Sequence, residues 1–362
     1  MLPWLFKSGA APVGAWLLLK PLLAKAVASS QPDAAQEEHK NPGPTYHDLF
    51  EDPNVWTPYE VAKAVVNSLL IMPFRIVLLL GVCVLAWASS KAVLLWHRAE
   101  WSAEERAAAE AKGQVLPARR PLAAWRARIF ELTVAAIARA VSFGMGFVSV
   151  PRVGPVPKRE ECPPIIVCNH ISIADAVFIL QDVLGCPVAK TGIDAVPVLG
   201  PVMTALQSVF VNRSDPDSRK EARDEIRARA MFSDSSYPPI IIFPEGTTST
   251  GVGLLQFKTG AFAPGLPVQP VIVRYPSHYC DPSYQSSAVL SIFRLLTQFV
   301  NYAELEYLPV YHPSPEEIAD PELYAENLRT LMARALGVPK GHFYFDNQAL
   351  MPLSSPANKV QE

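Results

Sequence analysis

The second half of the chain alternates short apolar runs with longer segments of helical periodicity. From about residue 148 onward, apolar runs predict strands at 165–168, 209–211, 239–243, 268–274 and 304–311. Between and after them, apolar residues at helical spacing predict helices at 174–184, 198–206, 217–231, 289–300 and 321–336. This alternation favours an α/β fold with a mostly parallel central sheet flanked by helices.

The first half is more continuously apolar and predicts membrane-associated helices in front of the α/β domain. Residues 64–90 carry one charge, Arg75, and one helix breaker, Pro73. The uninterrupted part, 76–89, is about 14 residues long, short of the ~20 that cross a bilayer. A tilted or kinked span, a hairpin bent at Pro73 and a buried core helix all fit. Residues 123–148 predict an amphipathic helix on the membrane or on the domain.

These patterns divide the chain into five segments. Residues 1–58 combine a basic apolar start with a proline-rich linker, and 59–98 hold the membrane-embedded helix or hairpin. Residues 99–147 form basic and amphipathic helices, 148–346 the α/β domain and 347–362 a tail. The first 30 residues contain no acid, which fits a signal-like segment, an organelle address or a membrane-surface helix.

Composition supports membrane contact and excludes other classes of function. Half of the residues are hydrophobic, 18% are charged and the mean hydropathy is +0.16, which is apolar for a soluble protein. The net charge of −2 gives the chain no excess of positive charge for binding phosphates, so no nucleic-acid partner is expected. The five scattered cysteines lack a CxxC pair, so we expect neither disulfides nor a metal site. Basic residues follow the 64–90 segment and acidic residues precede it, which puts the α/β domain in the cytosol.

Candidate chemistry begins with His170 and Asp175, just after the predicted strand 165–168. Five positions place two side chains about 140° apart on a helix and on opposite faces of a strand, so they meet only if the chain turns between them. A strand bending into a helix would let Asp175 orient His170 as a general base. Ser172 and Asp175 also fit a capping box. A second copy of the spacing, His47 with Asp52, shows that spacing alone decides little.

Two further predicted strands end in polar residues. Strand 209–211 runs into Arg213, and strand 239–243 runs into Glu245 and Gly246. In an open α/β sheet the ligand crevice lies outside the C-terminal ends of the strands, so we expect these residues to gather beside His170 and Asp175. The plainer alternatives are a surface ion pair for Arg213 and an ordinary turn for Glu245 and Gly246.

In this order the motifs resemble those of the glycerolipid acyltransferases of the 1-acyl-glycerol-3-phosphate acyltransferase type. Asn169-His170-x4-Asp175 matches the first motif and Val209-Phe210-Val211-Asn212-Arg213 is similar to the second. Phe243-Pro244-Glu245-Gly246-Thr247 matches the third, and Leu266-Pro267-Val268-Gln269-Pro270-Val271 is similar to the fourth. Residues 257–262, 308–311 and 320–325 are similar to the lysophosphatidylcholine and lysophosphatidylethanolamine acyltransferase branch. Gln207 departs from the second motif, which commonly has Gly there.

The resemblance implies acyl transfer from acyl-CoA, a co-substrate, to the free hydroxyl of a lysophospholipid, with no cofactor and no metal. His170 and Asp175 would be the catalytic pair. The implied substrate-binding residues are Arg213, Glu245, Gly246, Thr247, Lys258 and Pro270. Arg213 and Lys258 suit the acceptor phosphate, and backbone N–H groups near Gly246 or after His170 suit the oxyanion.

The resemblance also implies a bilayer as partner. We expect the membrane of the endoplasmic reticulum with a cytosol-facing site, and leave a plastid or mitochondrial membrane open. The branch includes longer members with calcium-binding hands, and calcium control is not expected here. An acyltransferase for lysophosphatidic acid or glycerol 3-phosphate is the nearest alternative, and an inactive lipid-binding protein on the same fold is the alternative from another class.

Overall fold

A seven-stranded sheet lies at the centre of the computed structural model, which describes residues 44–50, 56–159, 161–212, 215–232, 237–276, 280–283, 288–346 and 349–352. The strand order is β1-β7-β6-β2-β5-β3-β4. Neighbouring strands are parallel except for the antiparallel pair β6 and β7, so the predicted fold class is confirmed. The strands are β1 (Arg152–Val153), β2 (Ile165–Cys168), β3 (Cys186–Lys190), β4 (Val209–Val211), β5 (Ile240–Ile242), β6 (Val268–Arg274) and β7 (Glu304–Tyr307).

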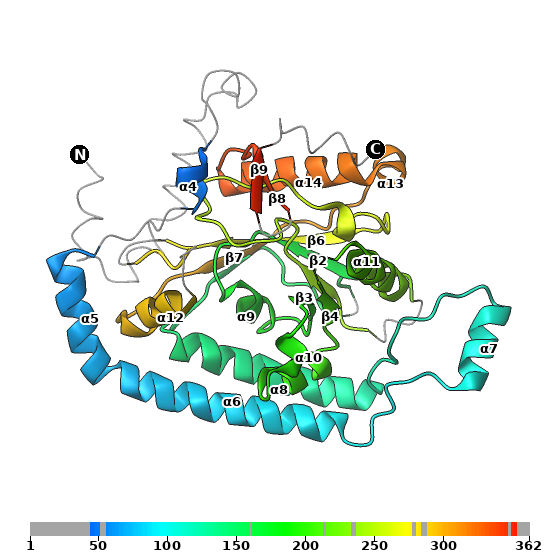
Figure 1. Ribbon diagram of the computed structural model, residues 1–362, viewed down its shortest axis with the longest axis horizontal. Coiled ribbons are helices and arrows are strands. Elements are labelled where there is room, and N and C mark those ends of the chain that lie inside the picture. Colours follow the sequence, from blue (N-terminus) through cyan, green and yellow to red (C-terminus); the bar gives the residue numbers. More distant parts are fainter. Residues whose placement is uncertain are drawn as a thin grey trace.

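Helices cover both faces of this sheet (Figure 1). One face carries α8 (Ala124–Gly144), α9 (Asp175–Ile179), α10 (Leu199–Ala205) and α12 (Ala288–Thr297), with α6 (Met72–Leu94) outermost. The other face carries α11 (Pro216–Ala230), α13 (Pro315–Ala319) and α14 (Pro321–Leu336). Short 3-10 turns, η1 (Ile193–Ala195) and η2 (Thr259–Ala261), and a hairpin of β8 (Phe343–Asp346) and β9 (Ala349–Pro352) complete the domain.

Strand residues alternate between two cores. In β2, Ile165 and Val167 pack with α11 and α14, whereas Ile166 and Cys168 pack with α9 on the opposite face. All four are fully buried. A strand buried on both faces is a continuous apolar run, which is why the predicted bounds of β2 match the observed ones. The predicted bounds of β4 and β6 also match, although β4 is a half-buried edge strand and β6 contains Gln269 and Pro270.

The sequence missed four strands, β1, β3, β8 and β9, and overextended others. The strand β3 contains Pro187 and ends in the exposed Lys190, so it lacks a long apolar run, although it lies between β5 and β4. The edge strand β1 has only two residues. Helix α9 ends at Ile179, five residues before the predicted end, because tight turns follow it, such as Gln181 N–H to the Phe178 carbonyl.

The segment expected to be a linker packs against the domain over residues 44–50, which include α4 (Tyr46–Phe50). Leu49 is fully buried, and a Cβ added to Gly253 or Gly341 would lie 3.5 Å from it. The Thr250 N–H donates to the Leu49 carbonyl at 3.0 Å. This segment therefore supports the loop that follows the third motif.

Helix α6 is continuous over 23 residues, so the expected shortfall in length is wrong. Pro73 stands in its first turn, where a missing N–H costs no helical hydrogen bond. The chain instead bends at Ile71, between α5 (Pro58–Leu70) and α6. Among the described residues, α6 is the one helix long and apolar enough to cross a membrane, and only 11% of its most apolar window is buried. The excursion to α7 (Ala103–Ala111) separates it from α8.

Candidate active site

His170 and Asp175 meet in a bend between β2 and α9. The His170 Nδ1 lies 2.9 Å from the Asp175 Oδ2. The N–H groups of Ile171 and Ser172 donate to the same oxygen at 2.8 and 2.9 Å. Asp175 is the first residue of α9, so its carboxylate closes the bend while it holds the imidazole. Only half of the expected capping box is present: Asp175 Oδ2 accepts the Ser172 N–H, whereas the Asp175 N–H donates to the Ser172 backbone carbonyl. The contacts of Asp175 that shape the bend also orient the imidazole.

The imidazole is fixed on two sides. Its ring stacks on Phe243, the residue after β5, with centroids 4.2 Å apart and planes 24° apart. Asp175 is fully buried, whereas the His170 side chain keeps 23% of its surface exposed. Because Nδ1 faces the carboxylate, Nε2 is the nitrogen left to exchange a proton with a substrate. The geometry suits a general base, and the catalytic role itself stays a prediction.

Asn169 extends the pairing of β2 with β6 beyond the end of β2. Its side-chain Nδ2 donates to the Val273 carbonyl at 3.0 Å, and its Oδ1 accepts the Val273 N–H at 2.8 Å. The side chain thus replaces a backbone partner and is almost fully buried. It sets where the bend toward His170 begins, a role that the sequence did not suggest.

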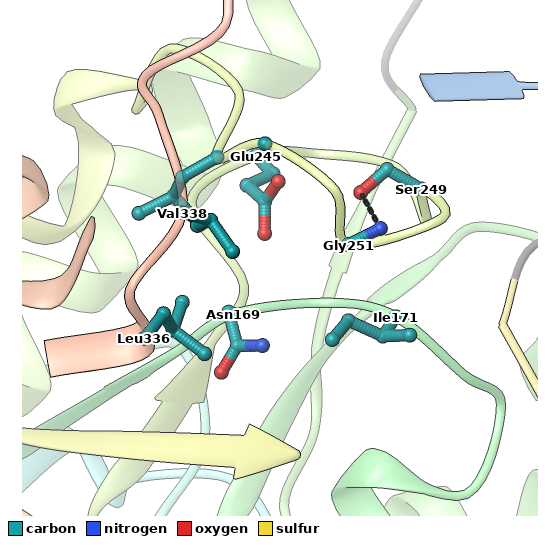
Figure 2. A pocket seen from close by; sticks show the side chains of 9 residues that line it. Asn169, Ile171, Glu245, Ser249, Gly251, Leu336 and Val338 are labelled. Carbon is teal, nitrogen blue, oxygen red and sulfur yellow. Dashed lines mark hydrogen bonds between the residues drawn. The ribbon is translucent and has the colours of Figure 1, made fainter. Parts of the chain in front are cut away.

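Glu245 faces the interior instead of an acceptor molecule. Its Oε1 accepts the His170 N–H at 2.8 Å and its Oε2 accepts the Leu255 N–H at 3.1 Å. Burial raises the pKa of this carboxyl to about 8. The two backbone N–H groups and the charge of Arg329 lower the pKa, but their effect is smaller than that of burial. Figure 2 shows Glu245 above Asn169 in a small pocket that Leu336 and Val338 also line. The side chain therefore ties the His170 bend to the loop around Leu255.

The rest of the third motif folds back on Lys258. Gly246 has a φ of +75°, and a Cβ there would lie 3.1 Å from the Lys258 Cε. The Gly246 N–H donates to the Phe243 carbonyl at 3.1 Å and the Lys258 N–H to the Pro244 carbonyl at 2.9 Å. The structure thus brings together Gly246 and Lys258, with the half-buried Thr247 next to them. Their substrate contacts stay predictions.

Other expected site residues lie elsewhere. Pro270 is buried within β6, opposite Val167 of β2, and its carbonyl accepts the Leu308 N–H, so it helps to build the sheet and does not line the site. Arg213 lies outside the described residues. So do Asp52 and the side chain of His47, the second copy of the spacing.

Three backbone N–H groups of the bend, where we expected oxyanion donors, are already engaged. The N–H groups of Ile171 and Ser172 are taken by Asp175, and the His170 N–H is taken by Glu245. Nor does Cys168 offer a nucleophile, because it is fully buried and burial raises the pKa of its thiol.

Tyr275 is a site residue that the sequence reasoning missed. Its hydroxyl donates to the Asp175 Oδ1. Tyr275 directly follows β6, which is parallel to β2, so both strands end at the same edge of the sheet. Applying the strand-end rule to the predicted strand 268–274 would have found it.

Comparisons with known proteins agree with this geometry. Residues 152–274 match the family model described as Acyltransferase. The chain is 36% identical to a lysophosphatidylcholine acyltransferase of Drosophila melanogaster, over 81% of this chain and 52% of that protein. It is 33% identical to a lysophospholipid acyltransferase of Arabidopsis thaliana, over 88% and 57%, and 40% identical to lysophosphatidylcholine acyltransferase 1 of Danio rerio, over 65% and 46%.

The chain spans about half the length of the curated relatives it matches. A solved structure, the 1-acyl-sn-glycerophosphate (LPA) acyltransferase PlsC of Thermotoga maritima, aligns over 59% of this chain and 80% of its own. Its TM-score of 0.43 and identity of 21% are too low to carry an argument. The family match and the relatives confirm the resemblance seen in the motifs: over residues 152–274, this chain carries a domain of the acyltransferase family.

Proposed function

We propose that this protein transfers a fatty acyl group from acyl-CoA to the free hydroxyl of a lysophospholipid. The observation that carries the proposal is the His170–Asp175 pair, held at 2.9 Å in a bend that leaves Nε2 available. The names of the relatives, lysophosphatidylcholine and lysophospholipid acyltransferases, support the acceptor class.

The reaction needs one proton to be moved twice. Nε2 of His170 takes the proton of the acceptor hydroxyl while that oxygen attacks the thioester carbonyl, and the Asp175 carboxylate stabilises the imidazolium. When the carbon–sulfur bond breaks, CoA leaves as a thiolate and takes the proton back. Arg213 and Lys258 would bind the acceptor phosphate, and Gly246 and Thr247 would line the acceptor site. No acyl-enzyme is required, and no protein nucleophile is invoked.

We further propose that the protein lies on the membrane surface, with α6 in the plane of the bilayer. Near the start of α6, Arg75 donates to the carbonyl of Leu296 in the last turn of α12 and to that of Phe299 just beyond it, both at 2.9 Å. At the end of α6, Arg126 of α8 donates to the Val93 carbonyl at 2.8 Å. Both ends are thus attached to one domain, so that domain would have to stand on both sides of the bilayer if α6 crossed it (Figure 1).

The outer face of α6 suits this placement. Phe74, Val77, Leu80, Val84 and Leu85 of α6 are all more than half exposed. The neighbouring helix α8 adds Trp125, Ile129 and Leu132, also exposed. Such an apolar face binds the boundary between headgroups and acyl chains, where both amphiphilic substrates reside. The endoplasmic reticulum stays the expected membrane, with plastid and mitochondrial membranes as alternatives.

The test is acyl-CoA-dependent acylation by membranes that contain the protein. The acceptors are lysophosphatidylcholine, lysophosphatidylethanolamine, lysophosphatidic acid and glycerol 3-phosphate, and both free CoA and acylated lipid are measured. We expect equal amounts of CoA and diacyl phospholipid from one or both of the first two acceptors. Activity with only the last two would reassign the acceptor, and no CoA release with any of them would refute the proposal.

A further inference from the structure

We propose that Tyr275 is a positioning residue for acyl transfer, which acts by holding the Asp175 carboxylate through its phenol. The proposal rests on the acyltransferase function proposed above. It assigns a role to a residue outside the four motifs that carry the resemblance.

The two oxygens of Asp175 have different partners. Oδ2 accepts from His170 Nδ1 and from the N–H groups of Ile171 and Ser172, all within 2.9 Å. Oδ1 accepts from the Tyr275 hydroxyl. Asp175 has no exposed surface, so solvent cannot take the place of the phenol without rearrangement. A buried carboxylate oxygen that loses its donor bears the cost of desolvation.

Tyr275 is held rigidly enough to orient Asp175. The preceding strand is fixed by the two hydrogen bonds between Asn169 and Val273. The Tyr275 ring packs against Phe147 and Phe178, with centroids 6.2 and 6.1 Å away. Phe178 belongs to α9, the helix that begins with Asp175. The phenol therefore links the end of β6 to the start of α9.

The state of the phenol agrees with this role. Burial and the negative charge of Asp175 hold the pKa of Tyr275 well above its ordinary value, so the hydroxyl stays protonated and donates. Without this donor, Oδ1 of Asp175 is buried without its partner and the carboxylate is held less firmly toward the imidazole. The loss therefore falls on the chemical step, in which the carboxylate stabilises the imidazolium.

The test compares Tyr275→Phe with Tyr307→Phe, a matched control. Tyr307 of β7 is buried, whereas Tyr275 is partly buried, and the Tyr307 hydroxyl also donates to a carboxylate, the Asp182 Oδ2, at 3.0 Å. We expect Tyr275→Phe to lower kcat by about tenfold or more, with KM for both substrates changed by no more than about twofold. Tyr307→Phe should lower stability and leave kcat unchanged.

A second measurement does not depend on turnover. The Nδ1 proton resonance of His170, recorded in detergent micelles with isotope-labelled histidine, should move in Tyr275→Phe and stay in place in Tyr307→Phe. An unmoved resonance, or a kcat that falls equally in both variants, would overturn the role of Tyr275. A moved resonance in a protein that releases no CoA would support the positioning role and reject the proposed function.

Discussion

At the scale of single residues, Asp175 has both a structural role in the bend and an orienting role toward His170. Its Oδ2 accepts two backbone N–H groups and contacts His170 Nδ1, so the contacts that shape the bend also orient the imidazole. The spacing His-x4-Asp is the number of residues this bend needs. A substitution of Asp175 should therefore damage both the bend and the chemistry, whereas one of His170 should damage the chemistry alone.

We expect His170→Ala to lower kcat by about 10²-fold to 10⁴-fold, because the general base is lost, with the unfolding temperature nearly unchanged. Asp175→Asn should lower kcat as strongly and also destabilise the fold, since an amide oxygen is a weaker acceptor for three donors. CoA release and thermal unfolding measure the two effects. His47→Ala is the control and should be silent; near-normal turnover in His170→Ala would reject the mechanism.

Glu245 should make stability depend on pH. Its pKa is about 8 in the fold against 4.5 ordinarily, so between these values the folded state holds a proton that the unfolded state has released. Stability should therefore fall as the pH rises from about 5 to 8, and this slope should vanish in Glu245→Gln. The unfolding midpoint, measured from pH 5 to 9, tests this.

Glu317 provides a control of opposite sign. It is also buried, but hydrogen bonds from Tyr311, Ser314 and Asn327 outweigh burial and lower its pKa. The stability that Glu317 contributes is lost as the pH falls. Glu317→Gln should therefore leave unchanged the decrease in stability that Glu245 causes between pH 5 and 8. An unchanged slope in Glu245→Gln would contradict the assignment.

Gln207 shows why the family commonly has Gly in the second motif. Its φ of +60° is left-handed, and its side-chain Oε1 is buried without a hydrogen-bond partner in the described part of the chain. We expect Gln207→Gly to raise the free energy of unfolding by about 1 kcal/mol, because the strain of a Cβ at this φ is removed. Gln207→Ala keeps the Cβ and removes the amide, so it separates the two effects in denaturant unfolding. A loss of stability in Gln207→Gly would contradict this explanation.

At the scale of the elements, the predictable strands are those with a dense local run of apolar residues. The strand β2 is buried on both faces and its four residues are all apolar, so its predicted bounds match the observed ones. The short apolar run of β4 and the mostly apolar run of β6 were also predicted with the observed bounds. The strand β3 was not predicted because Pro187 and Lys190 interrupt its apolar run. Its place in the sheet depends on hydrogen bonds with the backbone of β5 and β4. Local composition thus predicts where a strand or helix exists, but it does not predict which strands pair.

Arg75 connects α6 to the end of α12, and composition alone does not reveal this contact. Arg75 looks like a charge in a membrane helix, yet its guanidinium binds the carbonyl of Leu296 in the last turn of α12 and that of Phe299 just beyond it. Carbonyls at the end of a helix lack an N–H partner within the helix. Arg75→Met should lower the free energy of unfolding by about 2 kcal/mol, since hydrogen bonds from a charged group are lost. Thermal unfolding in detergent measures this. Lys91→Met, an exposed change in the same helix, should have little effect, and equal losses would contradict the capping role.

At the scale of the whole molecule, the membrane geometry is testable. In a background in which the three cysteines that are not buried, Cys83, Cys162 and Cys280, are replaced by Ser, a cysteine is introduced at Pro58 or at Glu100. Both positions are exposed, and together they bracket α5 and α6. If α6 lies in the bilayer plane, an impermeant maleimide should label both positions from the same side of sealed vesicles. Labelling of one position only, with the other reached after detergent is added, would show that α6 crosses the bilayer.

The sequence by itself determined the α/β class, most strand and helix positions, the motif residues and the reaction family they indicate. These depend on periodicity and on residue type, which are local. Tertiary structure decided which groups meet: Tyr275 with Asp175, Glu245 with the backbone of His170, and Arg75 with the end of α12. The members of these pairs are 75 to 221 residues apart in the chain. They meet because the order of the strands and the packing of the helices bring them to one edge or one face, and no local pattern encodes that arrangement.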